Sequence, residues 1–294
     1  MNAQSVVASI DLRGTSATLL GCDVDLVNSR SAWFNDRVVA FYGAHFQTMW
    51  DAGTGSEQPC CNFVFGDPAL LSFMCQYLDL SDSDECAGFL RGAFPELFPS
   101  AASSSPPLYL LLPVNPMYGT GAPPTSSLDQ GSHWTLLSLL LSPSPVPSCQ
   151  PLILDARHYD SMPSPSERNA KAARGLLTTF RRALSSSFPD GGGVGGSGSG
   201  SGGIGDDAPP RPSPLAFGHT PSVRQVDGSS CGLFAVLFGM GVQRAVKEKG
   251  GVVEGRALDE ALDKMLSEDV VEEWRIILRT MVKEEVHKYG RRGA

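Results

Sequence analysis

The sequence predicts a single α+β domain that spans residues 1–294. Three apolar stretches of strand length follow one another in the middle of the chain, at residues 108–114, 134–141 and 152–159. Segments with the apolar spacing of helices lie before these strands and after them. Strands gathered in the middle of a chain, with helices on both sides, are typical of the α+β class. Hydrophobic residues make up 41% of the chain, which is enough apolar material for a buried core.

Five segments carry the helical signals. A helix is expected from about Asn35, and residues 62–98 have helical character in pieces. Another helix starts at residues 164–167, where Ser can cap, Pro suits the first helical position and Glu stands three residues after Ser, and it runs to about Leu184. Residues 233–240 are apolar all round, as in a helix at the centre of a domain. The last helix carries Val270, Val271, Trp274, Ile277 and Leu278.

Two segments are predicted to be insertions within this domain. Residues 142–151 form a Pro-rich loop, and residues 191–214 form a Gly/Ser/Pro-rich segment that cannot bury apolar surface. Loops of this kind lengthen a fold at small thermodynamic cost. Short strands are expected at residues 16–20 and 215–217.

Charge and cysteine content restrict the class of protein. The chain has 23 Lys and Arg, 31 Asp and Glu and no basic block, which argues against nucleic acid as a partner. No apolar run approaches the roughly 20 residues of a membrane helix, and the N-terminus lacks the pattern of a secretory signal. Seven scattered Cys fit reduced thiols in the cytoplasm or nucleus. Because no Cys or His cluster has ligand spacing, we expect neither a metal nor a cofactor.

Cys231 is the first candidate for chemistry, because it opens the apolar helix. Ser229 and Ser230 precede it and are possible helix caps. The positive end of a helix dipole is expected to lower the pKa of a thiol at this position and to favour the thiolate. The alternative is a core Cys with no chemical role.

His133 is the candidate base that would deprotonate such a thiol, since it stands at the rim of a predicted strand. Asp160 ends the following strand, and a carboxylate there could fix the tautomer of the imidazole. His158 and Asp155 lie on the same strand and compete for these roles, and strand alternation does not choose between Asp155 and Asp160. Taken singly, His133 also fits a surface loop and Asp160 also fits a turn.

Gln225 and two Trp complete the set of candidates. Gln225 lies six residues before Cys231, where its amide could donate to an oxyanion, although it also fits an ordinary loop. Trp33 and Trp134 adjoin polar residues. They are either core residues or the walls of a narrow slot that admits only residues without side chains.

Four segments, taken together, resemble the Ulp/sentrin-specific cysteine proteases. They are Trp-Phe-Asn-Asp at 33–36, Gly-Ser-His-Trp at 131–134, His-Tyr-Asp-Ser-Met at 158–162 and Gln-Val-Asp-Gly-Ser-Ser-Cys-Gly at 225–232. Their order along the chain is that of the family, and the resemblance extends from about residue 22 to residue 278. It implies a papain-like fold of the Ulp/adenain type, with a central mixed sheet, flanking helices and a buried helix that starts at the catalytic Cys.

Within this family the sequence is most similar to the deneddylating branch. The similarity lies in Asp-Val-Asp-Leu at 23–26, in residues 63–78, in His-Tyr-Asp-Ser at 158–161 and in Glu-Trp at 273–274. The resemblance implies a cysteine protease that cleaves after the C-terminal Gly-Gly of a ubiquitin-like modifier, either in the precursor or in conjugates. The implied modifier is that of neddylation (Nedd/Rub), and the implied enzyme is a monomer.

The resemblance also implies a role for each candidate. Cys231, His133 and Asp160 form the triad, which places Asp160 ahead of Asp155, and Gln225 lines the oxyanion hole. Four further residues bind the modifier's tail: Trp33, Asn35, Asp36 and Trp134. The two Trp would flank a slot through which only Gly passes, because any Cβ would clash.

Two residues depart from the family pattern. Ser230 stands where the family usually has Asp before the Cys, and Phe34 replaces a usual Leu beside the tail slot. A SUMO protease of the same family is the first alternative. A catalytically impaired adaptor that only binds the modifier is the second, and an acyltransferase on the same fold is the third, although no basic pocket for an acyl-CoA is visible.

Overall fold

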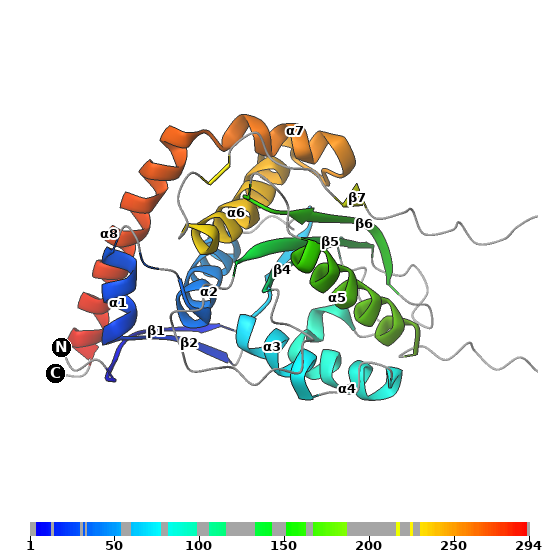
Figure 1. The fold of residues 1–294 in the computed structure, drawn as a ribbon, viewed down its shortest axis with the longest axis horizontal. Coiled ribbons are helices and arrows are strands. Elements are labelled where there is room, and N and C mark those ends of the chain that lie inside the picture. Colours follow the sequence, from blue (N-terminus) through cyan, green and yellow to red (C-terminus); the bar gives the residue numbers. More distant parts are fainter. Residues whose placement is uncertain are drawn as a thin grey trace, which may run out of the picture.

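A five-stranded mixed sheet forms the centre of the protein (Figure 1). Its strands lie in the order of the chain: β3 (Asn62–Phe65), β4 (Leu108–Val114), β5 (Thr135–Ser142), β6 (Leu152–Tyr159) and β7 (Ala216–Phe217). The two outer pairs, β3 with β4 and β6 with β7, are parallel, and the inner pairs are antiparallel. The predicted strands in the middle of the chain therefore form one sheet.

This architecture comes from a computed structural model. It describes residues 4–12, 15–29, 32, 34–53, 60–77, 82–98, 106–115, 133–142, 151–162, 167–186, 216–217, 224–225 and 230–292. Trp33, Ser229, residues 143–150 and residues 187–215 lie outside the described residues, and with them most of both predicted insertions.

Helices surround the sheet. In chain order they are α1 (Gly21–Asn28), α2 (Asp36–Gly53), α3 (Pro68–Tyr77), α4 (Ser83–Ala93), the short η1 (Pro95–Leu97), α5 (Glu167–Ser186), α6 (Cys231–Lys249), α7 (Gly255–Met265) and α8 (Glu268–Arg292). A hairpin of β1 (Val6–Leu12) and β2 (Thr15–Leu20) packs against α2 and α8. Within the part of the chain that the structure describes, no helix is both long enough and apolar enough to cross a lipid bilayer.

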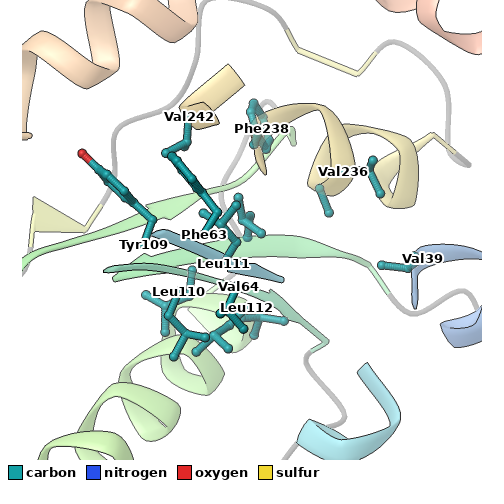
Figure 2. Close-up of a cluster of buried hydrophobic side chains, with 14 of the residues drawn as sticks. Val39, Phe63, Val64, Tyr109, Leu110, Leu111, Leu112, Val236, Phe238 and Val242 are labelled. Atoms are coloured by element: carbon teal, nitrogen blue, oxygen red, sulfur yellow. The ribbon is translucent and has the colours of Figure 1, made fainter. Parts of the chain in front are cut away.

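Helices α6 and α5 cover opposite faces of the sheet (Figure 1). Phe238 and Val242 of α6 lie over one face, while Leu110 and Leu112 of β4 point to the other (Figure 2). Every residue of β4 is buried, because both of its faces are covered. This is why the strand reads as a continuous apolar run rather than as an alternating pattern.

Helix α6 is buried from its first residue, Cys231, through Gly239. It ends at Gly250, whose φ of 67° lies in the left-handed region that glycine adopts without strain. The backbone N–H of Gly251 then donates to the Val246 carbonyl, which satisfies one of the last carbonyls of the helix. The predicted α+β fold, with a central mixed sheet and a buried helix that starts at Cys231, is confirmed.

Three elements have weak signals in the sequence and were not predicted. Helix α1 has eight residues, starts at a Gly and contains two Asp, all of which are poor helix formers. Helix α7 buries only Leu258, Asp259 and Leu262, so its apolar stripe is short. Strand β1 mixes apolar with small and polar residues.

Candidate active site

The pairing of β5 with β6 brings His133 and Asp160 together. His133 stands two residues before β5 and Asp160 directly follows β6, and the antiparallel register sets Leu136 opposite Tyr159. The start of β5 and the end of β6 therefore meet at the same edge of the sheet. There His133 Nε2 lies 2.6 Å from Asp160 Oδ1.

Three donors hold the carboxylate of Asp160, which is buried. Besides His133, the backbone N–H of Met162 donates to Oδ1 at 2.9 Å, and Asn169 Nδ2 donates to Oδ2 at 3.4 Å. Burial raises the pKa of Asp160, but the bonds from His133, Met162 and Asn169 outweigh burial, so the net shift is downward. Asp160 is therefore an anion at neutral pH, held next to an imidazole.

The contact with Asp160 fixes the tautomer of His133. A carboxylate only accepts hydrogen bonds, so Nε2 carries the proton and Nδ1 of the neutral ring keeps its lone pair. Nδ1 is buried and has no hydrogen-bond partner among the described residues. The ring therefore presents an unoccupied basic nitrogen on the side away from Asp160.

Cys231 begins α6, and its side chain is fully buried. Backbone N–H groups point at its sulfur: one from Trp134, which follows His133 in the chain, and others from Gly232 and Cys231 itself. The thiol therefore lies at the start of β5, beside the residue that follows the candidate base.

Burial raises the pKa of the Cys231 thiol to about 12, although these N–H groups lower it. The expected lowering by the helix dipole was wrong for the free protein, because a buried thiolate loses its hydration and the backbone donors do not replace it. At neutral pH the thiol is protonated, and it needs a base to form the thiolate.

Ser230 does not cap α6 with its side chain, which corrects a further expectation. It occupies the cap position, and only its carbonyl joins the helix, by accepting from the N–H of Phe234 at 3.0 Å. Its hydroxyl instead accepts from the guanidinium of Arg275 on α8. Arg275 also lies 3.6 Å from Glu272 and is mostly buried, so it offers a stronger partner than a backbone N–H.

Gln225 is tied to the residue that follows Asp160. Its backbone N–H donates to the Ser161 carbonyl at 3.0 Å, and its side-chain oxygen accepts from Ser161 Oγ at 2.9 Å. Because the amide oxygen is held in this way, the amide NH2 is the end of the side chain that can donate elsewhere.

A hydrogen bond joins Trp134 to Phe34, and these two residues belong to two of the sequence motifs described above. The Trp134 indole is buried, and its N–H donates to the Phe34 carbonyl at 2.9 Å. Phe34 also lies against the start of α6, where a Cβ added to Gly232 would come within 2.7 Å of the Phe34 Cβ. The segments that contain Phe34, Trp134 and Cys231 therefore converge at one point.

Asn35 and Asp36 start α2. The side-chain oxygen of Asn35 caps the helix by accepting from the N–H of Val38 at 3.0 Å, and its NH2 donates to Asp23 at 2.7 Å. Asp36 is exposed at the first helical position. The other predicted tail-binding aromatic, Trp33, lies outside the described residues.

The two competing residues on β6 have other partners. Asp155 lies 3.2 Å from Arg157 and accepts from the Gly255 N–H at 2.8 Å, at the side of the sheet near α7. His158 is buried with Nε2 2.9 Å from Thr135 Oγ1, and burial lowers its pKa to about 4, so it stays neutral. The choice that alternation left open is thereby made: Asp160, and not Asp155, contacts His133.

Sequence reasoning missed Asn169 and the role of Ser161. Asn169 lies nine residues after Asp160, in the first turn of α5, and is fully buried. A lone Asn near a helix start gives no signal of a tertiary contact, because such residues are common there. Ser161 was visible only as part of the His-Tyr-Asp-Ser motif.

The fold has counterparts among solved structures. No family model matches the sequence, and no curated protein matches it. The structure resembles that of the de-sumoylating protease with a TM-score of 0.52 and 13% identity, over 96% of this chain and 92% of that chain. Two other similar structures are the SUMO protease Ulp1 with its catalytic cysteine oxidised to a sulfinic acid (TM-score 0.45, 12% identity, 92% and 86% covered) and the Chaetomium thermophilum Ulp1-like SUMO protease catalytic domain (0.42, 18%, 89% and 81%).

The fold comparison depends on the first of these structures, because its TM-score exceeds 0.5 over nearly the whole length of both chains. At 13% identity the likeness is one of fold. The mixed α+β architecture matches the fold of the de-sumoylating protease.

Proposed function

We propose that the protein is a cysteine protease that cleaves after the C-terminal Gly-Gly of a ubiquitin-like modifier. The observation that carries this proposal is the arrangement at the start of β5, where His133 pairs with Asp160 and the backbone N–H of the next residue, Trp134, points at the Cys231 thiol. A base oriented by a carboxylate, next to a thiol at a helix start, is the arrangement that nucleophilic catalysis requires. The shared fold with the de-sumoylating protease supports the same activity.

In the proposed reaction, Cys231 transfers its proton to His133 Nδ1, and its sulfur attacks the carbonyl carbon of the terminal Gly. The amide NH2 of Gln225 and the backbone N–H of Cys231 donate to the oxyanion that forms. The C–N bond then breaks as His133 returns the proton to the leaving amine. Water hydrolyses the thioester and regenerates the thiol.

The raised pKa of the Cys231 thiol, which burial causes, is compatible with the proposed proton transfer. A buried thiolate is unfavourable alone, but an imidazolium beside it supplies the compensating charge. The anionic Asp160 stabilises that imidazolium in turn. We therefore infer that the thiol ionises as part of a thiolate–imidazolium pair.

The neddylation modifier, Nedd/Rub, is the first proposed substrate. The motifs at residues 23–26, 158–161 and 273–274 that resemble the deneddylating branch support it. SUMO is the second candidate, because the solved structure with the supporting fold is a de-sumoylating protease.

A panel of modifiers that carry a C-terminal electrophile tests the proposal. The wild-type chain is mixed with Nedd/Rub, SUMO and ubiquitin probes, and covalent labelling is followed by mass. We expect rapid labelling by one modifier, and none in the Cys231→Ala variant, which should still bind that modifier. Labelling of Cys231→Ala would place the nucleophile elsewhere. Binding without labelling of the wild type would identify a non-catalytic adaptor, which the Ser230 departure would fit.

A further inference from the structure

We propose that Asp23 is a positioning residue for the tail segment, defined here as Phe34, Asn35 and Asp36. Asp23 lies on α1, outside the residues assigned to catalysis or tail binding. The inference rests on the proposed function and on the expectation from the sequence that Asn35 and Asp36 bind the modifier's tail. It assigns the alignment of that segment to a buried carboxylate that cannot itself touch a substrate.

Asp23 is fully buried and accepts hydrogen bonds from four residues. The Leu20 N–H donates at 2.8 Å, the Cys22 thiol at 3.9 Å, Asn35 Nδ2 at 2.7 Å, and Arg37 from Nε at 2.8 Å and from Nη2 at 3.0 Å. A buried carboxylate is tolerated only when its oxygens are paired in this way. Two of the four donor residues, Asn35 and Arg37, lie in or next to the tail segment.

The contact with Asn35 fixes the start of α2. Its NH2 is bound to Asp23 while its oxygen caps the helix at Val38, so both ends of one amide are engaged. The amide cannot rotate without breaking one of these bonds. The backbone at Asn35 is therefore tied to α1 on one side and to α2 on the other.

A series of contacts also connects the tail segment to Trp134, which lies beside the Cys231 thiol. The Phe34 carbonyl accepts from the Trp134 indole, and the Phe34 side chain lies on Gly232. The backbone N–H of Trp134 donates to Cys231. A displacement of the tail segment would reach Trp134, whereas the His133–Asp160 pair is held by hydrogen bonds of its own.

Two variants test the proposal. Asp23→Asn keeps the shape of the side chain but loses the charge and presents an NH2 to donors. Asn35→Ser keeps the cap on α2, because Ser is as good a cap as Asn, but it is too short to reach Asp23. If Asp23→Asn does not fold, the substrate-free measurement on Asn35→Ser decides the question alone, because Asn35 is itself expected to contact the modifier.

Asp155→Asn is the matched control. Asp155 also binds an Arg and a backbone N–H, but it lies near α7 and has no contact with the tail segment among the described residues. It should change stability as Asp23→Asn does, without changing the tail segment.

The first measurement needs no substrate: hydrogen exchange of the Trp134 indole N–H, assigned with a Trp134→Phe variant. We expect exchange to accelerate about tenfold in Asp23→Asn and in Asn35→Ser, because the bond to Phe34 opens more often, and to stay at the wild-type rate in Asp155→Asn. Wild-type exchange in both test variants would overturn the proposal, whatever reaction the protein catalyses.

The second measurement uses the modifier that labels the wild type. We expect KM to rise about tenfold in both test variants, with kcat changed much less. The double variant Asp23→Asn/Asn35→Ser should be no worse than either single one, since both break the same tie. Additive losses would show two independent effects and would contradict the proposal.

Discussion

Gly232 lies directly against Phe34, and this contact leaves no room for a side chain at the second residue of α6. A Cβ at Gly232 would approach the Phe34 Cβ to 2.7 Å, closer than van der Waals contact allows. The backbone of Phe34 in turn accepts from Trp134 at 2.9 Å. The absence of a side chain at residue 232 thus lets three separate segments meet beside Cys231.

Replacing Gly232 with Ala tests this relationship. Overpacking of a buried site destabilises a protein by about 1–3 kcal/mol, and here the displaced group is part of the tail segment. We expect Gly232→Ala to lower the free energy of unfolding by about that amount and to slow labelling by the modifier electrophile. Urea unfolding and labelling rates measure the two effects.

Gly175→Ala is the control for this substitution. Gly175 is exposed within α5, and a Cβ added there meets nothing within 4 Å. Ala is the better helix former, so Gly175→Ala should stabilise the protein by about 0.5–1 kcal/mol with unchanged activity. Equal behaviour of the two Ala variants would contradict the packing argument.

The pH dependence of Cys231 alkylation tests the proposed ion pair. With the pKa of the isolated thiol raised to about 12 by burial, reaction at pH 7 depends on proton transfer to His133. We expect His133→Gln to reduce the rate of iodoacetamide alkylation at pH 7 by about 100-fold or more, because only the thiolate reacts. In that variant the rate should climb about tenfold per pH unit up to at least pH 9, as for a single unassisted thiol.

This measurement is made in a Cys60→Ser background, since Cys60 is exposed and would react first. A wild-type rate in His133→Gln at pH 7 would mean that another group ionises Cys231.

Because His158 is buried, we expect the folded protein to lose stability in mild acid. Burial lowers its pKa from 6.5 to about 4, so the unfolded chain binds a proton in this range and the folded protein does not. The contribution is fully present above pH 6.5 and is lost as the pH falls from 6.5 towards 4. The difference between these two pKa values corresponds to about 3 kcal/mol, because a tenfold change in an equilibrium constant is roughly 1.4 kcal/mol.

Urea unfolding of the wild type and of His158→Gln, from pH 7 to pH 4, measures the difference. Gln can still bond to Thr135 but does not titrate, so the variant should lose about 3 kcal/mol less over this range. Parallel curves would show that His158 is not the group responsible. The other carboxylates and histidines are common to both proteins and cancel in the comparison.

The contact between Ser230 and Arg275 leads us to expect that a substitution at residue 230 can stabilise the protein. Ser230 occupies the cap position of α6, and its hydroxyl contacts the Arg275 guanidinium. Ser230→Asp restores the residue usual in the resembling family, where its carboxylate would meet Arg275 and the helix N-terminus together. We expect a gain of about 1–2 kcal/mol in the free energy of unfolding, measured in urea.

The control is Ser230→Asp in an Arg275→Met background, where the gain in the free energy of unfolding should be smaller. A loss of stability in Ser230→Asp alone would mean that the position is too buried for a charge, even beside Arg275.

The sheet and the buried helix could be predicted from the sequence because burial on both faces leaves a direct mark. Strands β4 and β6 both have the predicted bounds, although only β4 is an uninterrupted apolar run that is buried throughout. Helix α6 was visible because it is apolar all round. Helix α1 was not visible, because its Gly and two Asp are poor helix formers and Asp23 accepts from Asn35 and Arg37, which lie 12 and 14 residues further along the chain.

The identity of the candidate residues was accessible from motifs, but their electrostatics were not. The sequence places Cys231 at a helix start and so predicts a lowered pKa. The structure adds that the thiol is fully buried, and burial reverses the shift. Likewise, alternation along β6 could not separate Asp155 from Asp160, because the choice depends on which end of the strand meets His133.

In the antiparallel register of β5 and β6, the two ends of the strand pair have different surroundings. His133 and Asp160 meet where β5 begins and β6 ends, whereas Ser142 pairs with Leu152 at the opposite end. Residues added between Ser142 and Leu152 would leave the chain at the opposite end of this strand pair from His133 and Asp160. A fluorescent reporter or an affinity tag spliced into this connection should therefore leave the His133–Asp160 contact intact, which makes it a suitable place to attach cargo to this protein.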